Sequence, residues 1–261
     1  NTPALFPAGR SSRMRSMEAS NRQANDERQS RRKGMQDPAL GIGCYTVPDA
    51  ARLLGLNGRS IHRWLGGYRF RERGRNTAMP PLWQPQLPLD DGSFELGFRD
   101  LIELRFVKAF IGAGLGLRTI RHCLDFARQQ VNDQRPFSTR RFRTDGRTIF
   151  LESAHLAGEA ELLDLRSKQY ALGQVIDRSF KDIDIDAEAV VRWRPLNGKR
   201  TIVIDPARAF GQPISTDYGV PTVALAQAAA AEGSPARAAK LFEVPISVVK
   251  DALAFEQSLA A

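Results

Sequence analysis

The most informative part of the sequence is Tyr45-Thr-Val-Pro-Asp-Ala-Ala-Arg-Leu-Leu-Gly-Leu-Asn-Gly-Arg-Ser-Ile-His-Arg-Trp-Leu65. Thr46 stands three residues before Asp49, which is close to the spacing of a capping box and predicts the start of a helix. Gly55 predicts the sharp turn after this helix. A second short helix is expected over Arg59–Leu65. The stretch is therefore typical of two helices joined by a tight turn.

The second helix is expected to be basic on its outward side. Its apolar residues recur at helical spacing and are expected to be buried: Ile61, Trp64 and Leu65. The opposite side carries Arg59, Ser60, His62 and Arg63. A helix-turn-helix with Arg and His on its second helix favours binding in a DNA groove. An ordinary helical hairpin would also explain the apolar spacing.

A basic pair of strands is expected directly after the two helices. From Tyr68 to Arg71, aromatic residues alternate with arginines, which indicates a strand with one apolar and one basic face. Met79–Gln84 is expected to be the return strand, at a sheet edge because it contains two prolines. This flap would form a wing beside the DNA backbone. The residues expected to contact DNA are therefore Thr46, Arg59, Ser60, His62, Arg63, Tyr68, Arg69, Arg71 and Arg73.

The composition agrees with a globular protein that has an anionic partner. The chain has 261 residues, of which 42% are hydrophobic, and a formal net charge of +9. This apolar share is sufficient for a core and excludes wholesale disorder. The excess of arginine favours a polyanion such as DNA, because guanidinium groups bind phosphate and guanine in a bidentate manner. A GC-rich genome would also produce this excess.

Neither a disulfide framework nor a metal site is expected. Cys44 and Cys123 are the two cysteines, and they lack the spacing of metal-binding pairs. His122 and Cys123 are adjacent, so on a helix their side chains would point about 100° apart. No apolar run has the length of a membrane span, and no signal peptide is recognised. A cytoplasmic protein without a cofactor, a metal or a membrane partner is therefore expected.

The chain is expected to be α+β, mainly α, in four regions: a disordered basic tail (1–40), a winged helix-turn-helix (41–130), a β-rich connecting region (131–200) and a C-terminal helix-turn-helix domain (201–261). The tail has too few apolar residues to offset the entropy of ordering. It is either an over-extended translation start, with Met35 among the alternative starts, or a basic arm for DNA phosphates.

Several elements are expected after the wing. Two helices, Phe98–Ile111 and Leu117–Ala127, are separated by a Gly-rich break. Phe137–Leu151 alternates around Asp145-Gly146, which predicts a β-hairpin. The expected elements that follow are a short helix, Gln174–Phe180, and the strands Val190–Pro195 and Thr201–Asp205; Leu162–Leu172 is ambiguous between strand and helix. Asp182–Asp186 lacks the Gly and Glu of a calcium loop and is expected to be an alternating strand or its cap.

Three helices are expected at the C-terminus. The first runs from Pro221 to Ala231, the second covers Ala236–Phe242, and the third is capped by Ser247. The last helix is expected to expose Lys250, Asp251 and Glu256, so its outward face is close to neutral. A DNA-binding face needs basic residues to offset phosphate repulsion. DNA is therefore assigned to the N-terminal region. The C-terminal region is assigned to self-association or a protein partner.

The N-terminal region resembles the DNA-binding domain of the MerR family of regulators over about residues 45–128. The matching residues are Tyr45-Thr-Val47, Ala50-Ala51, Leu54-Gly-Leu56, Ser60-Ile61, Leu104-Arg-Phe106, Ala113-Gly-Leu115 and Ile120-Arg121. This resemblance implies a winged helix-turn-helix that binds double-stranded DNA. No sustained heptad for the long dimerising coiled coil of that family follows.

The C-terminal region, about residues 202–256, is similar to a small helix-turn-helix family of unknown function. The matching residues are Phe210-Gly-Gln-Pro-Ile214, Tyr218-Gly-Val-Pro-Thr222 and Val223-Ala-Leu225, with Val248, Ala252, Phe255 and Glu256. Members are commonly antitoxins encoded beside toxins with a PIN-like ribonuclease fold, and the combination resembles larger VapB-type antitoxins. The resemblance implies a homodimer that represses its own operator and neutralises a nuclease. A stand-alone MerR-like transcriptional regulator is the alternative.

A toxin-binding surface would need cations, because PIN-like toxins hold metal with clustered carboxylates. The candidate residues are Arg192, Arg194, Lys199, Arg200 and Arg208. A solvated basic strand edge that discourages aggregation would explain them equally well. No Ser-His-Asp or Cys-His arrangement is recognised, so an enzyme is not expected.

Overall fold

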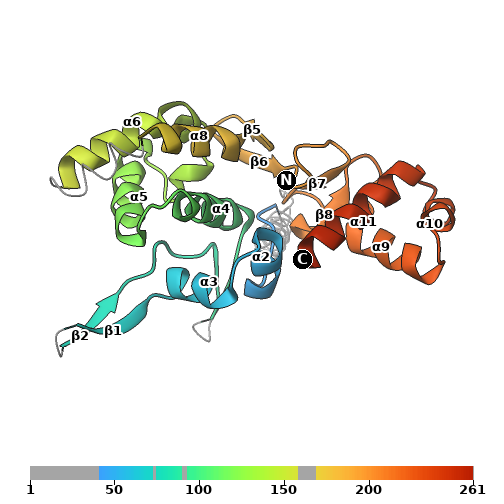
Figure 1. Ribbon diagram of the computed structural model, residues 1–261, viewed down its shortest axis with the longest axis horizontal. Coiled ribbons are helices and arrows are strands. Elements are labelled where there is room, and N and C mark those ends of the chain that lie inside the picture. The colour runs from blue at the N-terminus through green and yellow to red at the C-terminus, as the bar shows by residue number, and fades with distance from the viewer. Residues whose placement is uncertain (1–40, 73–74, 90–92, 158–168, 261) are drawn as a thin grey trace, which may run out of the picture. The chain divides into compact units, whose positions relative to one another are not determined.

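The two helices around Gly55 form as expected. The structure is a computed structural model that describes residues 41–72, 75–89, 93–157 and 169–260. Helix α2 (Val47–Leu54) begins with a complete capping box, in which the Thr46 hydroxyl accepts from the Asp49 amide at 3.2 Å. Helix α3 (Gly58–Leu65) begins one residue earlier than predicted, and the Asn57 side chain caps it. Figure 1 shows α3 next to the strand pair that follows it, with α2 on the other side of α3.

The strand pair is antiparallel, with β1 (Tyr68–Glu72) opposite β2 (Arg75–Met79). The prediction that Met79–Gln84 is the return strand was wrong, because β2 already ends at Met79. Two prolines follow that residue and cannot donate hydrogen bonds to a ladder. The next residues, Leu82 and Trp83, pack into the core instead. The chain then forms two short paired strands, β3 (Leu87–Pro88) and β4 (Phe94–Glu95).

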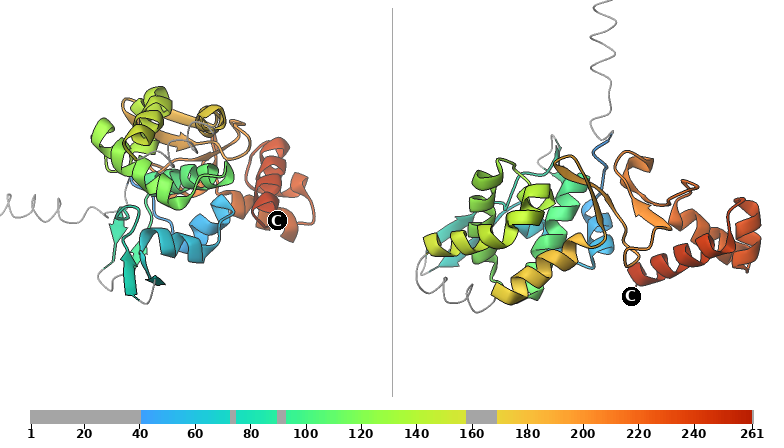
Figure 2. Two further views of the ribbon diagram at one scale, coloured as in Figure 1. Left: turned by 60° about the vertical axis from the view of Figure 1, so that its left-hand side comes forward. Right: turned by 90° about the horizontal axis from the view of Figure 1, so that it is seen from above.

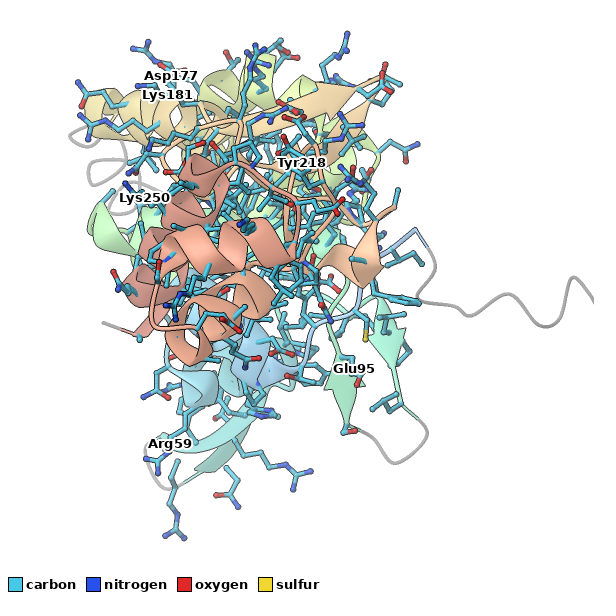
Figure 3. All side chains as sticks on the ribbon, turned by 90° about the vertical axis from the view of Figure 1, so that its right-hand side faces the viewer. Arg59, Glu95, Asp177, Lys181, Tyr218 and Lys250 are labelled. Carbon is cyan, nitrogen blue, oxygen red and sulfur yellow. The ribbon has the colours of Figure 1, made fainter. Side chains whose placement is uncertain are left out.

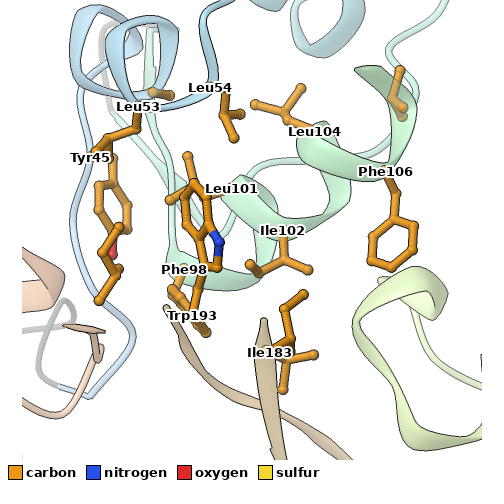
Figure 4. Packing of buried hydrophobic residues seen from close by; sticks show 14 of the residues in the cluster. Tyr45, Leu53, Leu54, Phe98, Leu101, Ile102, Leu104, Phe106, Ile183 and Trp193 are labelled. Atoms are coloured by element: carbon orange, nitrogen blue, oxygen red, sulfur yellow. The ribbon is translucent and has the colours of Figure 1, made fainter. Parts of the chain in front are cut away.

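Helices α4 (Phe98–Gly112) and α5 (Leu117–Val131) confirm the predicted helix pair and its Gly-rich break. The short 3-10 helix η1 (Pro136–Ser138) follows. Aromatic residues dominate the core at this point: Phe106, Phe110, Phe137, Phe142, Phe150 and Phe180. The closest ring pairs are Phe110 with Phe150 and Phe137 with Phe142, each with centroids 4.8 Å apart. Figure 4 shows α4 inside this core, with Leu53 and Leu54 of α2 to one side.

The hairpin predicted for Phe137–Leu151 was wrong, because the chain forms helix α6 (Arg140–Ala157) there. Asp145-Gly146 favours a turn locally. However, Phe142, Gly146 and Ile149 are all buried, and their spacing places them on one face of a helix. Any Cβ at Gly146 would lie 3.1 Å from the Phe142 ring. Burial of this face against the aromatic core therefore outweighs the local turn preference.

The following elements end in a small antiparallel sheet. Helix α8 (Gln169–Phe180) confirms and extends the predicted short helix. The sheet has the order β5-β6-β7-β8, with β5 (Ile183–Asp186), β6 (Ala189–Trp193), β7 (Ile202–Ile204) and β8 (Pro213–Ser215). A 3-10 turn, η2 (Ala209–Gly211), precedes β8. The strands expected around Asp184, Val190 and Ile202 are thus confirmed, whereas most of Leu162–Leu172 lies outside the described residues.

Three helices complete the chain: α9 (Thr222–Ala231), α10 (Pro235–Leu241) and α11 (Ile246–Ala260). Figure 2 shows them grouped together in both views. Ser234 caps α10, because its hydroxyl accepts from the Ala236 amide at 3.1 Å. Ser247 does not cap α11, because that helix already begins at Ile246. The protein is α+β, with helices predominating over small antiparallel sheets.

The predicted regional boundaries stay predictions, and the predicted tail at 1–40 lies outside the described residues. Within the part of the chain that the structure describes, no helix is long and apolar enough to cross a membrane.

Candidate nucleic-acid interface

Helix α3 separates an apolar side from a basic side. Ile61 is fully buried, and Trp64 and Leu65 are nearly so. On the other side Arg59, His62 and Arg63 are exposed, and Ser60 is half-buried. Figure 3 shows Arg59 pointing away from the helices. The placement of these four side chains therefore agrees with a surface that can meet a ligand.

Arg63 is held against the strand pair. Its guanidinium carbon lies 3.9 Å from the centroid of the Tyr68 ring, which is a close cation–π contact. The Tyr68 and Phe70 rings are themselves 5.8 Å apart. Helix α3 and strand β1 are thereby joined by a basic and an aromatic side chain. Arg63 loses less side-chain entropy on binding when its position is already restricted.

The strand pair has two chemically different faces. Cross-strand register places Tyr68 opposite Met79 and Arg69 opposite Ala78. Because side chains alternate along a strand, Arg69 and Arg71 share the face opposite to that of Tyr68. Both arginines are exposed. The structure therefore brings Arg63 and Tyr68 together but places Arg69 and Arg71 on the other face; Arg73 lies outside the described residues.

The exposed arginines of helix α3 and strand β1 share one electrostatic property. Among the described residues, no carboxylate forms an ion pair with Arg59, Arg63, Arg69 or Arg71. The His62 ring lies beside Phe94, with centroids 5.6 Å apart. Arginines without acidic partners can bind phosphates without first breaking an internal pair.

Thr46 has a different environment from the other candidates. Its hydroxyl donates to a carboxylate oxygen of Asp49 at 2.6 Å, and its amide donates to the same oxygen at 3.1 Å. The side chain thus serves the cap of α2, with an acid directly beside it. A DNA contact by Thr46 stays a prediction.

Sequence reasoning missed the residues that attach the strand pair to the core. Arg121 and Arg128 lie on α5 and donate to backbone carbonyl oxygens. Arg121 donates to those of Pro80 and Pro81 at 2.8 and 2.9 Å, and Arg128 donates to that of Leu82 at 2.5 Å. Backbone carbonyls are acceptors whatever side chain they carry, so sequence contains no direct signal for these contacts.

The buried carboxylate of Asp100 also attaches the segment after β2 to the core. Asp100 is fully buried and accepts from the Trp83 indole at 2.9 Å and from the Gln86 amide at 2.7 Å. Its second side-chain partner is the Arg135 guanidinium, at 2.6 Å. The segment after β2 is therefore fixed to α4 by charge-assisted hydrogen bonds.

Helix α4 carries a second buried acid, Glu103, whose pKa is raised. Glu103 is fully buried and accepts from the Ser138 and Phe137 amides at 2.8 and 3.3 Å. Burial raises its pKa from 4.5 to about 7, and the two amides and Arg99 oppose this shift without cancelling it.

Most predicted toxin-binding cations already have internal partners. Arg192 pairs with Asp205 at 2.9 Å, Arg194 with Asp184 at 2.6 Å and Lys199 with Asp251 at 3.1 Å. Arg208 donates to the carbonyl oxygen of Thr216 at 2.8 Å. Arg200 is exposed, and no described carboxylate pairs with it. The structure thus does not gather the five into one set of unpaired cations.

Among the residues that the structure places, no three His, Cys, Asp or Glu side chains form a cluster that could hold a metal ion.

Fold and surface together define an α+β protein with a basic unit of two helices and a hairpin, and a C-terminal group of three helices. The chain is similar to a protein of Mycobacterium tuberculosis (strain ATCC 25618 / H37Rv) named "Putative antitoxin VapB45". The two are 28% identical over 196 residues, which cover 69% of this chain and 79% of the relative.

Its fold is similar to that of Rv2018 from Mycobacterium tuberculosis, known from a crystal structure. The TM-score is 0.63 at 20% identity, over 82% of this chain and 99% of the other. No protein-family model matches the chain.

Proposed function

We propose that this protein is an antitoxin that binds its own operator DNA as a homodimeric repressor and neutralises a PIN-like ribonuclease. The observation that carries the DNA-binding part is the exposed basic side of α3, where Arg59 and Arg63 have no acidic partner among the described residues. The name of the Mycobacterium tuberculosis relative supports the antitoxin part.

In this proposal, α3 reads a DNA groove and the hairpin positions it. Arg59 and Arg63 contact base edges, since arginine can donate two hydrogen bonds to guanine. Arg69 and Arg71 contact phosphates, which position the protein but specify no sequence. A two-fold dimer would place its two copies of α3 about 34 Å apart, in successive turns of the same groove.

The toxin would bind the C-terminal part of the chain. Here Arg200 is the first residue to test, because the other candidates are engaged within the protein. Their use against an acidic toxin site would require exchange of internal partners. Such an exchange would leave an internal carboxylate, for example the buried Asp205, without its cation, at a cost in free energy.

A stand-alone transcriptional regulator is the second candidate function. A difference in ion pairing favours it. Arg59 and Arg63 have no acidic partner among the described residues, whereas Arg192, Arg194 and Lys199 are paired internally. On this alternative the protein binds operator DNA and needs no toxin partner.

Two measurements test the proposal. Gel shifts at increasing salt should show tighter binding to the DNA upstream of the protein's own gene than to an unrelated fragment of equal length. Equal affinity for both fragments would contradict the repressor function. Co-expression with the neighbouring reading frame should yield a complex and relieve its toxicity. Operator binding without such a complex would support the stand-alone regulator.

A further inference from the structure

A cavity of about 520 Å³ is lined by none of the residues proposed to contact DNA or a toxin. Four elements line it: α2, α4, α8 and β6. Its volume is within the range of pockets that bind small molecules.

One part of the cavity wall is apolar. Leu53 and Leu54 of α2, Val175 of α8 and the indole of Trp193 line this part. The Trp193 N–H already donates to Asp182 at 3.0 Å, so the indole offers the cavity its ring rather than a free donor. Figure 4 shows Leu53, Leu54 and Trp193 within the buried cluster.

The other part of the wall is cationic. Arg105, Lys108 and Arg178 line the cavity, and none of the other described lining residues is acidic. Arg105 is fixed by an ion pair of 2.7 Å with Asp182, outside the cavity lining. Lys108 donates to the Leu54 carbonyl oxygen at 2.5 Å, which uses one of its three N–H groups. Arg178 is exposed and has no ion-pair partner among the residues that the structure places.

We propose that this cavity binds a small organic anion with an apolar body. Its carboxylate accepts hydrogen bonds from Lys108 and Arg178, and its apolar body packs on the leucines, Val175 and the Trp193 ring. An inorganic anion would leave the apolar wall facing water. An uncharged apolar molecule would forgo the charge-assisted hydrogen bonds, which are the stronger ones. None of the residues proposed to contact DNA or a toxin lines this binding site.

Titration calorimetry on the whole chain tests the site with octanoate and 4-phenylbutyrate. Their amides, octanamide and 4-phenylbutanamide, have the same apolar bodies without the charge. We expect one carboxylate to bind per chain, about tenfold or more tighter than its amide. Absence of carboxylate binding at millimolar concentration would overturn the proposal, as would equal affinity for acid and amide.

Variants then locate the site. Lys108→Met combined with Arg178→Met keeps the apolar stems and should weaken carboxylate binding about tenfold or more. Val175→Phe keeps both cations but fills the cavity, and should also weaken binding. Lys181→Met removes a nearby exposed cation that does not line the cavity, and should change nothing.

Circular dichroism establishes that each variant is folded. If the double variant does not fold, Arg178→Met alone serves, since that side chain is exposed. Unchanged affinity in Val175→Phe, or an equal loss in Lys181→Met, would place the anion elsewhere and overturn the assignment.

Discussion

The hydroxyl of Tyr45 donates a hydrogen bond of 2.8 Å to the carbonyl oxygen of Gly211, 166 residues away in the chain. Tyr45 is 3% exposed and directly precedes the cap of α2, whereas Gly211 ends the turn before β8. The Cys44 amide donates to the Phe210 carbonyl oxygen at 3.0 Å beside it. The N-terminal helices and the C-terminal segment are thus joined by a buried contact that tolerates little change in shape.

Gly211→Ala should destabilise the protein by about 1–3 kcal/mol. A Cβ at this position would lie 2.2 Å from the Tyr45 hydroxyl, and the backbone φ is +81°. Gly112→Ala is the matched control, because its Cβ would meet nothing within 4 Å. Urea unfolding should show the loss for Gly211→Ala and little change for Gly112→Ala.

Adding Tyr45→Phe to Gly211→Ala should recover part of the lost stability. The hydroxyl would be gone, while the strained φ and a contact of 2.9 Å with the ring carbon would remain. A double variant no more stable than Gly211→Ala alone would show that the steric contact with the hydroxyl is not the cause.

Arg59→Ala and Arg63→Ala should each reduce the preference for the operator over unrelated DNA, by about 1–3 kcal/mol. Arg71→Ala should weaken binding to both DNAs and lower the salt slope by about one. Lys250→Ala on α11 is the control, because that exposed cation lies on the helix not assigned to DNA. Gel shifts in a salt series measure all four. Equal losses on both DNAs for Arg59→Ala would contradict its assignment to a groove.

Glu103 should make stability depend on pH near neutrality. Since burial raises the pKa of Glu103 to about 7, the folded state holds a proton that the unfolded state has already released above 4.5. The contribution of this group to the free energy of unfolding is therefore present at low pH. It falls as pH rises from about 4.5 to about 7, by at most ~1.4 kcal/mol per pH unit.

Glu103→Gln removes this titration while keeping the size of the side chain. The free energy of unfolding of the variant should rise relative to that of the natural protein between pH 5 and pH 7.5. Denaturant unfolding across this range measures the difference. A difference that is constant with pH would mean that Glu103 titrates as it does in the unfolded chain.

Arg135→Met should destabilise the protein by about 3–5 kcal/mol, because it leaves the fully buried Asp100 without its cation. Arg141→Met is the control: its pair with Asp145 is 3.7 Å long, and both side chains are about half exposed. Loss of an exposed pair costs at most about 1 kcal/mol. Similar losses in the two variants would argue that the Asp100 carboxylate is satisfied by its other donors alone.

The first helices could be predicted because their signals are local. Thr46, Asp49 and Gly55 lie within ten residues, and each has one dominant effect on the backbone. Helix α6 could not be predicted from Asp145-Gly146, because its stability comes from packing on aromatic residues such as Phe106, which is remote in sequence. Local preference and tertiary packing disagree there, and packing prevails.

The basic side of α3 was also predictable, since helical spacing alone separates Ile61 from Arg63. The contact of Arg63 with Tyr68 and the internal pairing of Arg192 and Lys199 were not. These depend on the path of the chain between elements. A count of cations in the sequence therefore overstates how many remain free.

Arg121 and Arg128 of α5 hold the segment that follows β2 by hydrogen bonds to peptide carbonyl oxygens and not to carboxylates. The bond from Arg128 to Leu82 is partly buried, so dissolved ions screen it much less than the attraction between an exposed arginine and a phosphate. Raising the ionic strength should therefore detach the nucleic acid while leaving the orientation of the hairpin intact. The protein would reach each new DNA molecule with its binding surface already arranged.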